Sequence, residues 1–215
     1  MADKKKVIDT WKLKTWYSVL APKFLGEVEL AKTPASDEDK LLNRVIILPL
    51  KEVTRDIAHI YTNTKLRVFE IKGKTAFTKF IGHEVSREYL STLVRRHRDA
   101  LHCVYPVKSK DGVEFTIKVL VVTAVPCSNT QKTSLRNALK KELVAKVAAT
   151  DFGRFINEAL YGRLGAELSQ KLKRIAPIRR IEIKKTQLKE EFDTDAVEKI
   201  EGESESEGAE EAKPA

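Results

Sequence analysis

LHCVYPVKSKDGVEFTIKVLVVTAV, residues 101–125, contains two β-rich runs on either side of Lys110-Asp111-Gly112. Asp-Gly between such runs is typical of a tight hairpin, because glycine adopts a positive φ without steric cost. In the second run, 113–125, apolar residues first alternate with polar ones and then occupy both positions. This pattern predicts a strand that is solvated on one face at its start and buried on both faces at its end.

The residues before this hairpin predict strands that would pair with it. Short apolar runs bounded by turn residues lie at 24–30, 45–50, 65–71 and 75–81. Gly26 would form a β-bulge in the first run, and Lys72-Gly73-Lys74 would form the turn of a second hairpin. We expect a polar turn at 33–40 and one or two helical turns within 51–59.

Residues 86–101 have the clearest helical pattern. Ser86 is a good N-cap residue, and apolar residues recur at helical spacing along one arc. His97 falls on this arc and would be half-buried. Arg87, Arg95 and Arg98 fall on the opposite face, which would be either a phosphate-binding surface or simply a solvated face.

The residues after the central hairpin are mainly helical. Helices are predicted at 131–149, 151–161 and 164–174, with breaks at Gly162 and Gly165. Pro177 ends the last helix, and 177–185 has the pattern of a strand with Ile181 and Ile183 facing inward. The chain is therefore expected to have an α+β fold.

The expected organisation has three parts. Residues 1–23 form a basic aromatic arm, and 187–215 form a flexible acidic tail that lacks the apolar residues needed for a core. Between them, 24–186 form one globular domain. Its parts are β-rich residues 24–125, helical residues 130–175 and a late strand at 177–185.

Charge is unevenly distributed along the chain. The net charge is +9, but residues 201–215 contain six glutamates and one lysine, so the first 200 residues carry +14. Such a basic body favours a polyanion as partner, although basic domains without nucleic-acid partners also exist.

The arm combines lysines with both tryptophans of the protein. Lysines neutralise phosphates, and aromatic rings stack on unpaired bases. The alternative for Trp16 and Tyr17 is that these rings pack on the core. The complete set of predicted RNA-binding residues is basic except for one tryptophan: Lys4, Lys5, Lys6, Lys12, Lys14, Trp16, Lys23, Lys72, Lys74, Arg87, Arg95, Arg98, Lys173, Arg174, Arg179, Arg180, Lys184 and Lys185.

The sequence lacks recognisable motifs for catalysis, metal binding and cofactor binding. The two cysteines, Cys103 and Cys127, lack the spacing of a zinc site, and no phosphate-binding loop or nucleophile elbow occurs. We expect no catalytic residues, no metal and no cofactor. No stretch is apolar enough to span a membrane, and the N-terminal residues lack the apolar core of a signal peptide, so a cytoplasmic protein is expected.

The order of these features resembles a known family. The stretch VIDTWKLKTWYSVLAPKFLGEVELAKT, 7–33, is similar to the start of the small-subunit ribosomal proteins shared by archaea and eukaryotes, called the "three-a-e" type. GHEVSREYLSTLVRRHR at 82–98, the Asp111-Gly112 turn and IAPIRRIEIKK at 175–185 follow in the order of that family. The resemblance extends over about residues 4–190. Arg95-Arg96-His97 departs from the lysines and aromatic residue typical of relatives, and the acidic tail has no fixed counterpart.

This resemblance implies a structural, RNA-bound protein of an archaeal type. It implies a β-barrel-like core with packed helices, located on the small-subunit platform near the mRNA exit and the 3′ end of the rRNA. The implied partners are small-subunit rRNA and neighbouring platform proteins, with mRNA and initiation factors within reach. Two alternatives stay open: a free RNA-binding translation factor and an RNA-processing enzyme.

Overall fold

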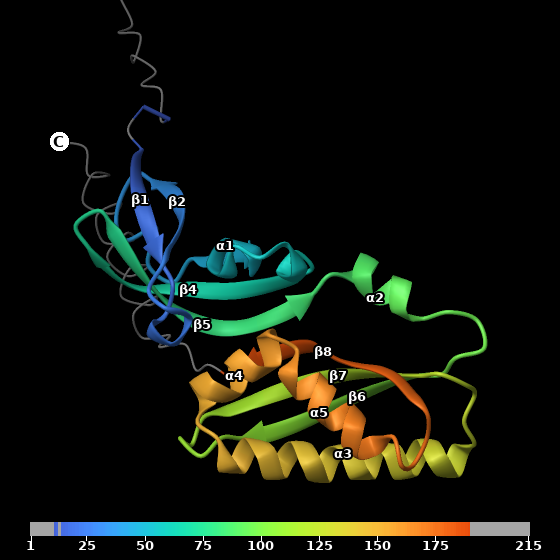
Figure 1. Cartoon of the computed structure of the whole chain (residues 1–215). Coiled ribbons are helices and arrows are strands. Elements are labelled where there is room, and N and C mark those ends of the chain that lie inside the picture. Colours follow the sequence, from blue (N-terminus) through green and yellow to red (C-terminus); the bar gives the residue numbers. More distant parts are fainter. Residues whose placement is uncertain (1–10, 13, 190–215) are drawn as a thin grey trace, which may run out of the picture.

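The structure is a computed structural model that describes residues 11–12 and 14–189. The described residues form one mixed sheet of eight strands together with five α-helices, which confirms the α+β fold (Figure 1). The main path through the sheet is β2-β1-β5-β8-β7-β6, and β4 and then β3 extend it from the other edge of β5. Among the described residues, no helix is both long and apolar enough to cross a membrane.

The central hairpin has the predicted form. Strand β6 (Ala100–Lys108) pairs antiparallel with β7 (Glu114–Thr123), and Gly112 in the turn has a φ of 81°. Phe115, Ile117 and every residue from Val119 to Thr123 are buried. The end of β7 is therefore covered on both faces, as its sequence predicted.

The second hairpin is also confirmed, together with the elements that precede it. Strands β4 (Thr62–Lys72) and β5 (Thr75–Val85) pair antiparallel around Gly73. The preceding elements are strand β3 (Val45–Pro49), helix α1 (Lys51–Thr54) and the 3-10 helix η2 (Ile57–His59).

The strand expected at 24–30 is wrong. Lys23–Leu25 is a 3-10 helix, η1, which ends at Gly26 with a φ of 94°, so Gly26 terminates a helical turn rather than forming a bulge. Strand β2 instead runs over Glu29–Ala35 and includes part of the expected polar turn. It pairs with β1 (Thr15–Leu20), which also runs parallel to the start of β5. The apolar run at 24–30 predicted a strand there, but antiparallel pairing with β1 places the strand later, at β2.

The helix expected at 86–101 is too long. Helix α2 covers only Arg87–Leu93, and Val94 is already extended. The reason is tertiary packing. Ala100 pairs with Val122 at the start of β6, so the last residues of the expected helix belong to a strand instead. His97 lies in the connection with a φ of 60°, and it is exposed rather than half-buried.

Three helices follow β7, close to their predicted positions. They are α3 (Asn129–Ala149), α4 (Phe152–Leu160) and α5 (Arg163–Leu172). Ser128 and Gln131 form a capping box at the start of α3, and the four buried residues of α3 repeat every four positions. Figure 1 shows α3 and α5 on one side of the β6–β7–β8 part of the sheet.

Gly165 does not break the last helix. It lies within α5 and is buried against strand β8 (Ile178–Leu188), where an added Cβ would lie 2.5 Å from the carbonyl oxygen of Ile181. Glycine is therefore required at this position for close packing of helix on strand. Ile181 and Ile183 face inward as predicted, and β8 continues slightly beyond its expected end.

A short junction between β5 and β8 connects the two parts of the sheet. Only three residue pairs form it: Gly82 with Gln187, His83 with Thr186 and Glu84 with Lys185. The buried imidazole of His83 accepts a hydrogen bond at Nδ1 from the Thr186 hydroxyl (2.7 Å). Its Nε2–H donates to the Ile183 carbonyl (3.1 Å). This arrangement needs the neutral ring, and burial lowers the pKa of His83 from 6.5 to about 4.

The close approach at this junction predicts the effect of adding one methyl group. In Gly82→Ala, the new Cβ would lie 2.2 Å from the Thr186 carbonyl oxygen, so the strands must separate. We expect the free energy of unfolding to fall by about 2 kcal/mol or more, measured by urea denaturation. The control is Gly153→Ala, whose Cβ would meet the Phe24 side chain at 3.2 Å. Equal stability of the two variants would contradict a tight junction.

The buried His83 predicts an acid-sensitive fold. The unfolded chain binds a proton at this residue below about pH 6.5, whereas the folded chain does so only near pH 4. Stability should therefore fall as the pH drops through this window, by up to about 3 kcal/mol. His83→Gln should lose this part of the pH dependence in urea denaturation at pH 7 and pH 4, whereas the exposed-residue control His102→Gln should keep it. A wild-type pH dependence in His83→Gln would refute the assignment.

Candidate nucleic-acid interface

The structure separates the predicted RNA-binding residues into two groups. Lys4, Lys5 and Lys6 lie outside the described residues, and their role stays a prediction. Most of the others lie either at the turn of the β4–β5 hairpin or at the opposite end of the molecule, beside the connection from α2 to β6 (Figure 1).

We call the first group the hairpin-tip group, which consists of Lys12, Lys14, Trp16, Lys72 and Lys74. β1 brings them together, because the Ser18 N–H donates to the Lys74 carbonyl (2.9 Å) and β1 runs parallel to β5 from that point. Trp16 is 55% exposed, whereas its neighbours Tyr17 and Val19 are buried. Of the two rings, Tyr17 therefore packs on the core, whereas Trp16 does not.

Two lysines of the hairpin-tip group already contact aromatic rings. The Lys14 ammonium lies 4.5 Å from the centre of the Trp11 ring, and that of Lys72 lies 5.4 Å from the Phe77 ring. Lys72 also forms an ion pair with Glu70 (3.0 Å), whereas Lys74 has none with any described residue. This end of the molecule thus combines free positive charge with exposed indole surface.

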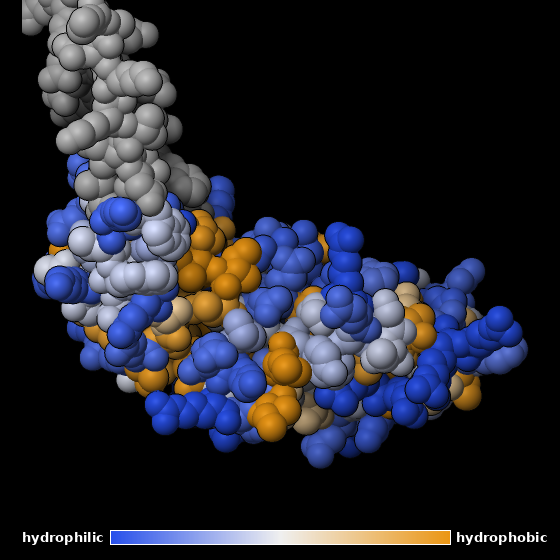
Figure 2. All heavy atoms as spheres, turned by 90° about the horizontal axis from the view of Figure 1, so that it is seen from above, coloured by the Kyte–Doolittle hydropathy of each residue, from blue (hydrophilic) through white to orange (hydrophobic). Residues whose placement is uncertain are grey.

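The second group, the strand-end group, consists of Arg95, Arg98, Lys173, Arg174, Arg179 and Arg180. Sheet register brings it together, since Ala100 pairs with Val122, which in turn pairs with Arg180. The connections that precede β6 and β8 therefore emerge at the same end of the sheet. Figure 2 shows hydrophilic side chains gathered at the right-hand end of the molecule, where the α2–β6 connection lies.

A register shift on β8 exposes two arginines in succession. The pairing of β7 with β8 shifts between Val122 and Thr123, and Arg179 is left without a partner in the ladder. Ile178 and Ile181 are buried while Arg179 and Arg180 between them are both exposed. A regular strand would have turned one of them inward, so the bulge doubles the positive charge on the outer face.

Acidic neighbours compensate only some of these charges. Arg180 pairs with Glu182, whereas the other five members of the strand-end group have no ion pair within residues 11–12 and 14–189. Lys185 contacts Glu84 (3.3 Å), which Lys65 also contacts (2.9 Å), and the Lys65 hydrogen bond is the main reason that the pKa of Glu84 is lowered. Lys185 thus supports the β5–β8 junction.

The remaining candidates are scattered. Lys23 lies in η1, Arg87 begins α2, and Lys184 lies in the middle of β8. The structure does not gather these three into either group. Among the described residues, no cluster of three or more histidine, cysteine, aspartate or glutamate side chains could hold a metal ion.

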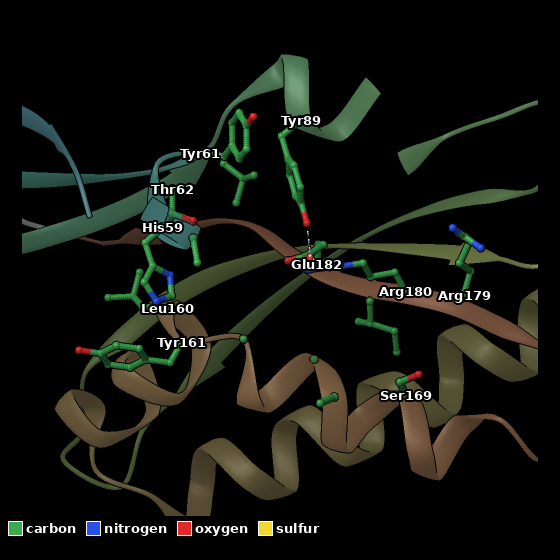
Figure 3. Close-up of a pocket in the computed structure, with 16 residues that line it drawn as sticks. His59, Tyr61, Thr62, Tyr89, Leu160, Tyr161, Ser169, Arg179, Arg180 and Glu182 are labelled. Atoms are coloured by element: carbon green, nitrogen blue, oxygen red, sulfur yellow. Dashed lines mark hydrogen bonds and ion pairs between the residues drawn. The ribbon is translucent and has the colours of Figure 1, made fainter. Parts of the chain in front are cut away.

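Sequence reasoning missed a pocket beside the strand-end group. Tyr61, Tyr89 and Tyr161 line it, together with Arg179 and Arg180 (Figure 3). Tyr61 directly precedes β4, Tyr89 lies in α2, Tyr161 lies between α4 and α5, and the arginines lie in β8, so no local pattern identifies them. The only signal in the sequence was the pair of arginines.

Comparison with known proteins gave one consistent result. The model of the Ribosomal S3Ae family matches residues 2–191. The small ribosomal subunit protein eS1 of Saccharolobus islandicus is 37% identical over 180 residues, covering 84% of this chain and 86% of the relative. The protein of the same name from Sulfurisphaera tokodaii is 36% identical over 188 residues, covering 87% and 97% of the two chains.

The hairpin-tip group predicts a fluorescence change on RNA binding. Both tryptophans are exposed, Trp11 by 59% and Trp16 by 55%, so acrylamide should quench the intrinsic fluorescence efficiently. RNA that covers this end should reduce the quenching constant. Lys72→Glu with Lys74→Glu should remove the protection, because these lysines supply positive charge at the same end of the molecule. Quenching that RNA leaves unchanged would exclude this end from the interface.

Proposed function

Since the chain belongs to the Ribosomal S3Ae family, we propose that it is a structural constituent of the small ribosomal subunit. This membership confirms the resemblance inferred from the sequence and the expectation of a protein without enzymatic activity. The observation that carries the proposal is the extent of the match, since the family model covers residues 2–191 and not one motif alone.

In this proposal the protein binds small-subunit rRNA through its two basic groups. Cations without an acidic neighbour neutralise phosphates most effectively, because no internal ion pair must be broken first. Five of the six strand-end residues and Lys74 at the hairpin tip meet this condition among the described residues. The two groups lie at opposite ends, so one molecule would contact two separate segments of RNA backbone.

The finer assignments also remain part of the proposal. The protein would lie on the platform of cytoplasmic ribosomes, near the mRNA exit and the rRNA 3′ end, and would support subunit assembly and translation. Its neighbours would be other platform proteins, with mRNA and initiation factors within reach. A free RNA-binding translation factor with the same surface is the second candidate.

Charge reversal at the strand-end group tests the proposed RNA contacts. Lys173→Glu with Arg174→Glu should weaken binding to small-subunit rRNA of Saccharolobus solfataricus, a source of another relative. It should also reduce the slope of log K against log salt by about 2, since each lost phosphate contact removes roughly 0.9. Filter binding over a range of salt concentrations measures both quantities.

The matched control is Lys140→Glu with Lys141→Glu on the exposed side of α3. It changes the net charge equally, and neither lysine has an ion pair with a described residue. The slope should stay near that of the wild type in this control. Equal changes in both variants would mean that net charge, and not the strand-end group, determines binding.

A further inference from the structure

The pocket beside the strand-end group has the dimensions of a small-ligand site. It has a volume of about 460 Å³, within the usual range of ligand pockets. One wall comes from η2 and the start of β4, together with α2, and the other from α5 and β8 (Figure 3). Gly162 and Ala166 line the α5 side, and their small size leaves this space unfilled, whereas Gly165 beside them packs against β8.

Aromatic rings in this pocket are exposed yet held in place. Tyr61 and Tyr161 are 48% and 45% exposed. Tyr61 stacks on Tyr89 with a centroid distance of 5.1 Å and an interplanar angle of 16°, while Tyr161 meets His59 edge to face at 5.4 Å. A ligand that stacks on either ring would not have to order it first, which reduces the entropic cost of binding.

The stack on Tyr61 is anchored from behind. The Tyr89 hydroxyl donates to Glu182 Oε1 (3.1 Å), and the Arg180 guanidinium lies 5.8 Å from the centre of the Tyr89 ring. Burial, reinforced by Glu182, raises the pKa of Tyr89 to about 12, so this hydroxyl keeps its proton near neutral pH. Tyr89 therefore has a positioning role.

The charge of the pocket is positive. Glu182 is the acidic residue that lines it, and Arg180 pairs with that carboxylate. Arg179 has no ion pair with any described residue, and the bulge on β8 keeps it on the outer face beside Arg180. An anionic ligand with a flat ring fits this combination better than an acidic or purely apolar one.

We propose that this pocket binds one unpaired nucleotide of RNA, with the base stacked on Tyr61 or Tyr161 and a phosphate of the flanking backbone contacted by Arg179, which lies beyond Arg180 and Glu182 (Figure 3). The inference rests on the proposed function, because it assumes that RNA covers the strand-end group. It adds recognition of an unstacked base to the sequence-independent neutralisation of phosphates. Double-stranded RNA cannot supply such a base, so the pocket favours a loop, a bulge or a free end.

The test compares single-stranded with double-stranded RNA. The probes are a short single-stranded RNA that contains 2-aminopurine and the same strand annealed to its complement. Binding of the single strand should quench the 2-aminopurine fluorescence of the wild type through stacking. Tyr61→Leu with Tyr161→Leu should weaken single-strand binding by about tenfold, the usual effect of losing one base–aromatic stack. It should leave duplex binding and the salt slope unchanged.

Two further variants separate stacking from charge and from nonspecific effects. Phe69→Leu removes an equally exposed ring (53%) outside the pocket and should bind both probes as the wild type does. Arg179→Gln should reduce the salt slope by about 1 for the single strand, since one phosphate contact is lost. The two single variants Tyr61→Leu and Tyr161→Leu then show which ring carries the stack.

The outcomes distinguish this inference from the proposed function. Unchanged single-strand affinity and fluorescence quenching in the double tyrosine variant, with normal salt-dependent RNA binding, would overturn the pocket and leave the proposed function intact. Retained duplex binding by the variant shows that it is folded. A wild-type protein that binds neither probe would overturn both.

Discussion

Close contact between β5 and β8 is the constraint on which the rest of the structure depends. Only three residue pairs join these strands, and an added methyl group at Gly82 would collide with the backbone at Thr186. His83 fills the space beside Gly82 as a neutral ring, with one hydrogen bond to a hydroxyl and one to a carbonyl. The junction connects the two hairpins, and with them the strands and helices attached to each.

The junction also explains the arrangement of positive charge. The β4–β5 hairpin carries Lys72 and Lys74 at its turn, on one side of the junction, and β8 carries Arg179 and Arg180 at its other end. The strand pairing between them sets the spacing of two basic groups that are far apart in the sequence. Positioning RNA requires such spacing, whereas catalysis would require reactive groups gathered in one place.

The sequence correctly predicts those elements in which the turn residues, caps and apolar spacing favour the same structure as the packing of the whole fold. The central hairpin and α3 fall into this class, since Asp111-Gly112 favours the turn, Ser128 caps the helix and the apolar spacing matches the observed burial. The helix at 86–101 fails because its periodic apolar residues also suit a strand, and β7 offers an edge that needs a partner. The strand at 24–30 fails for a similar reason, since β1 pairs with later residues. The pocket could not be predicted, because Tyr61 and Tyr161 are brought together only by packing.

Whether the protein is a stable part of the small subunit is the central question. Sucrose-gradient fractionation of a native lysate in high salt, with this chain followed by immunoblot, addresses it most directly. High salt removes proteins held only by weak, exposed charge contacts, because log K falls linearly with log salt. A structural constituent should stay in the small-subunit fractions. Recovery of the chain at the top of the gradient would contradict the structural role and favour a transient RNA-binding factor.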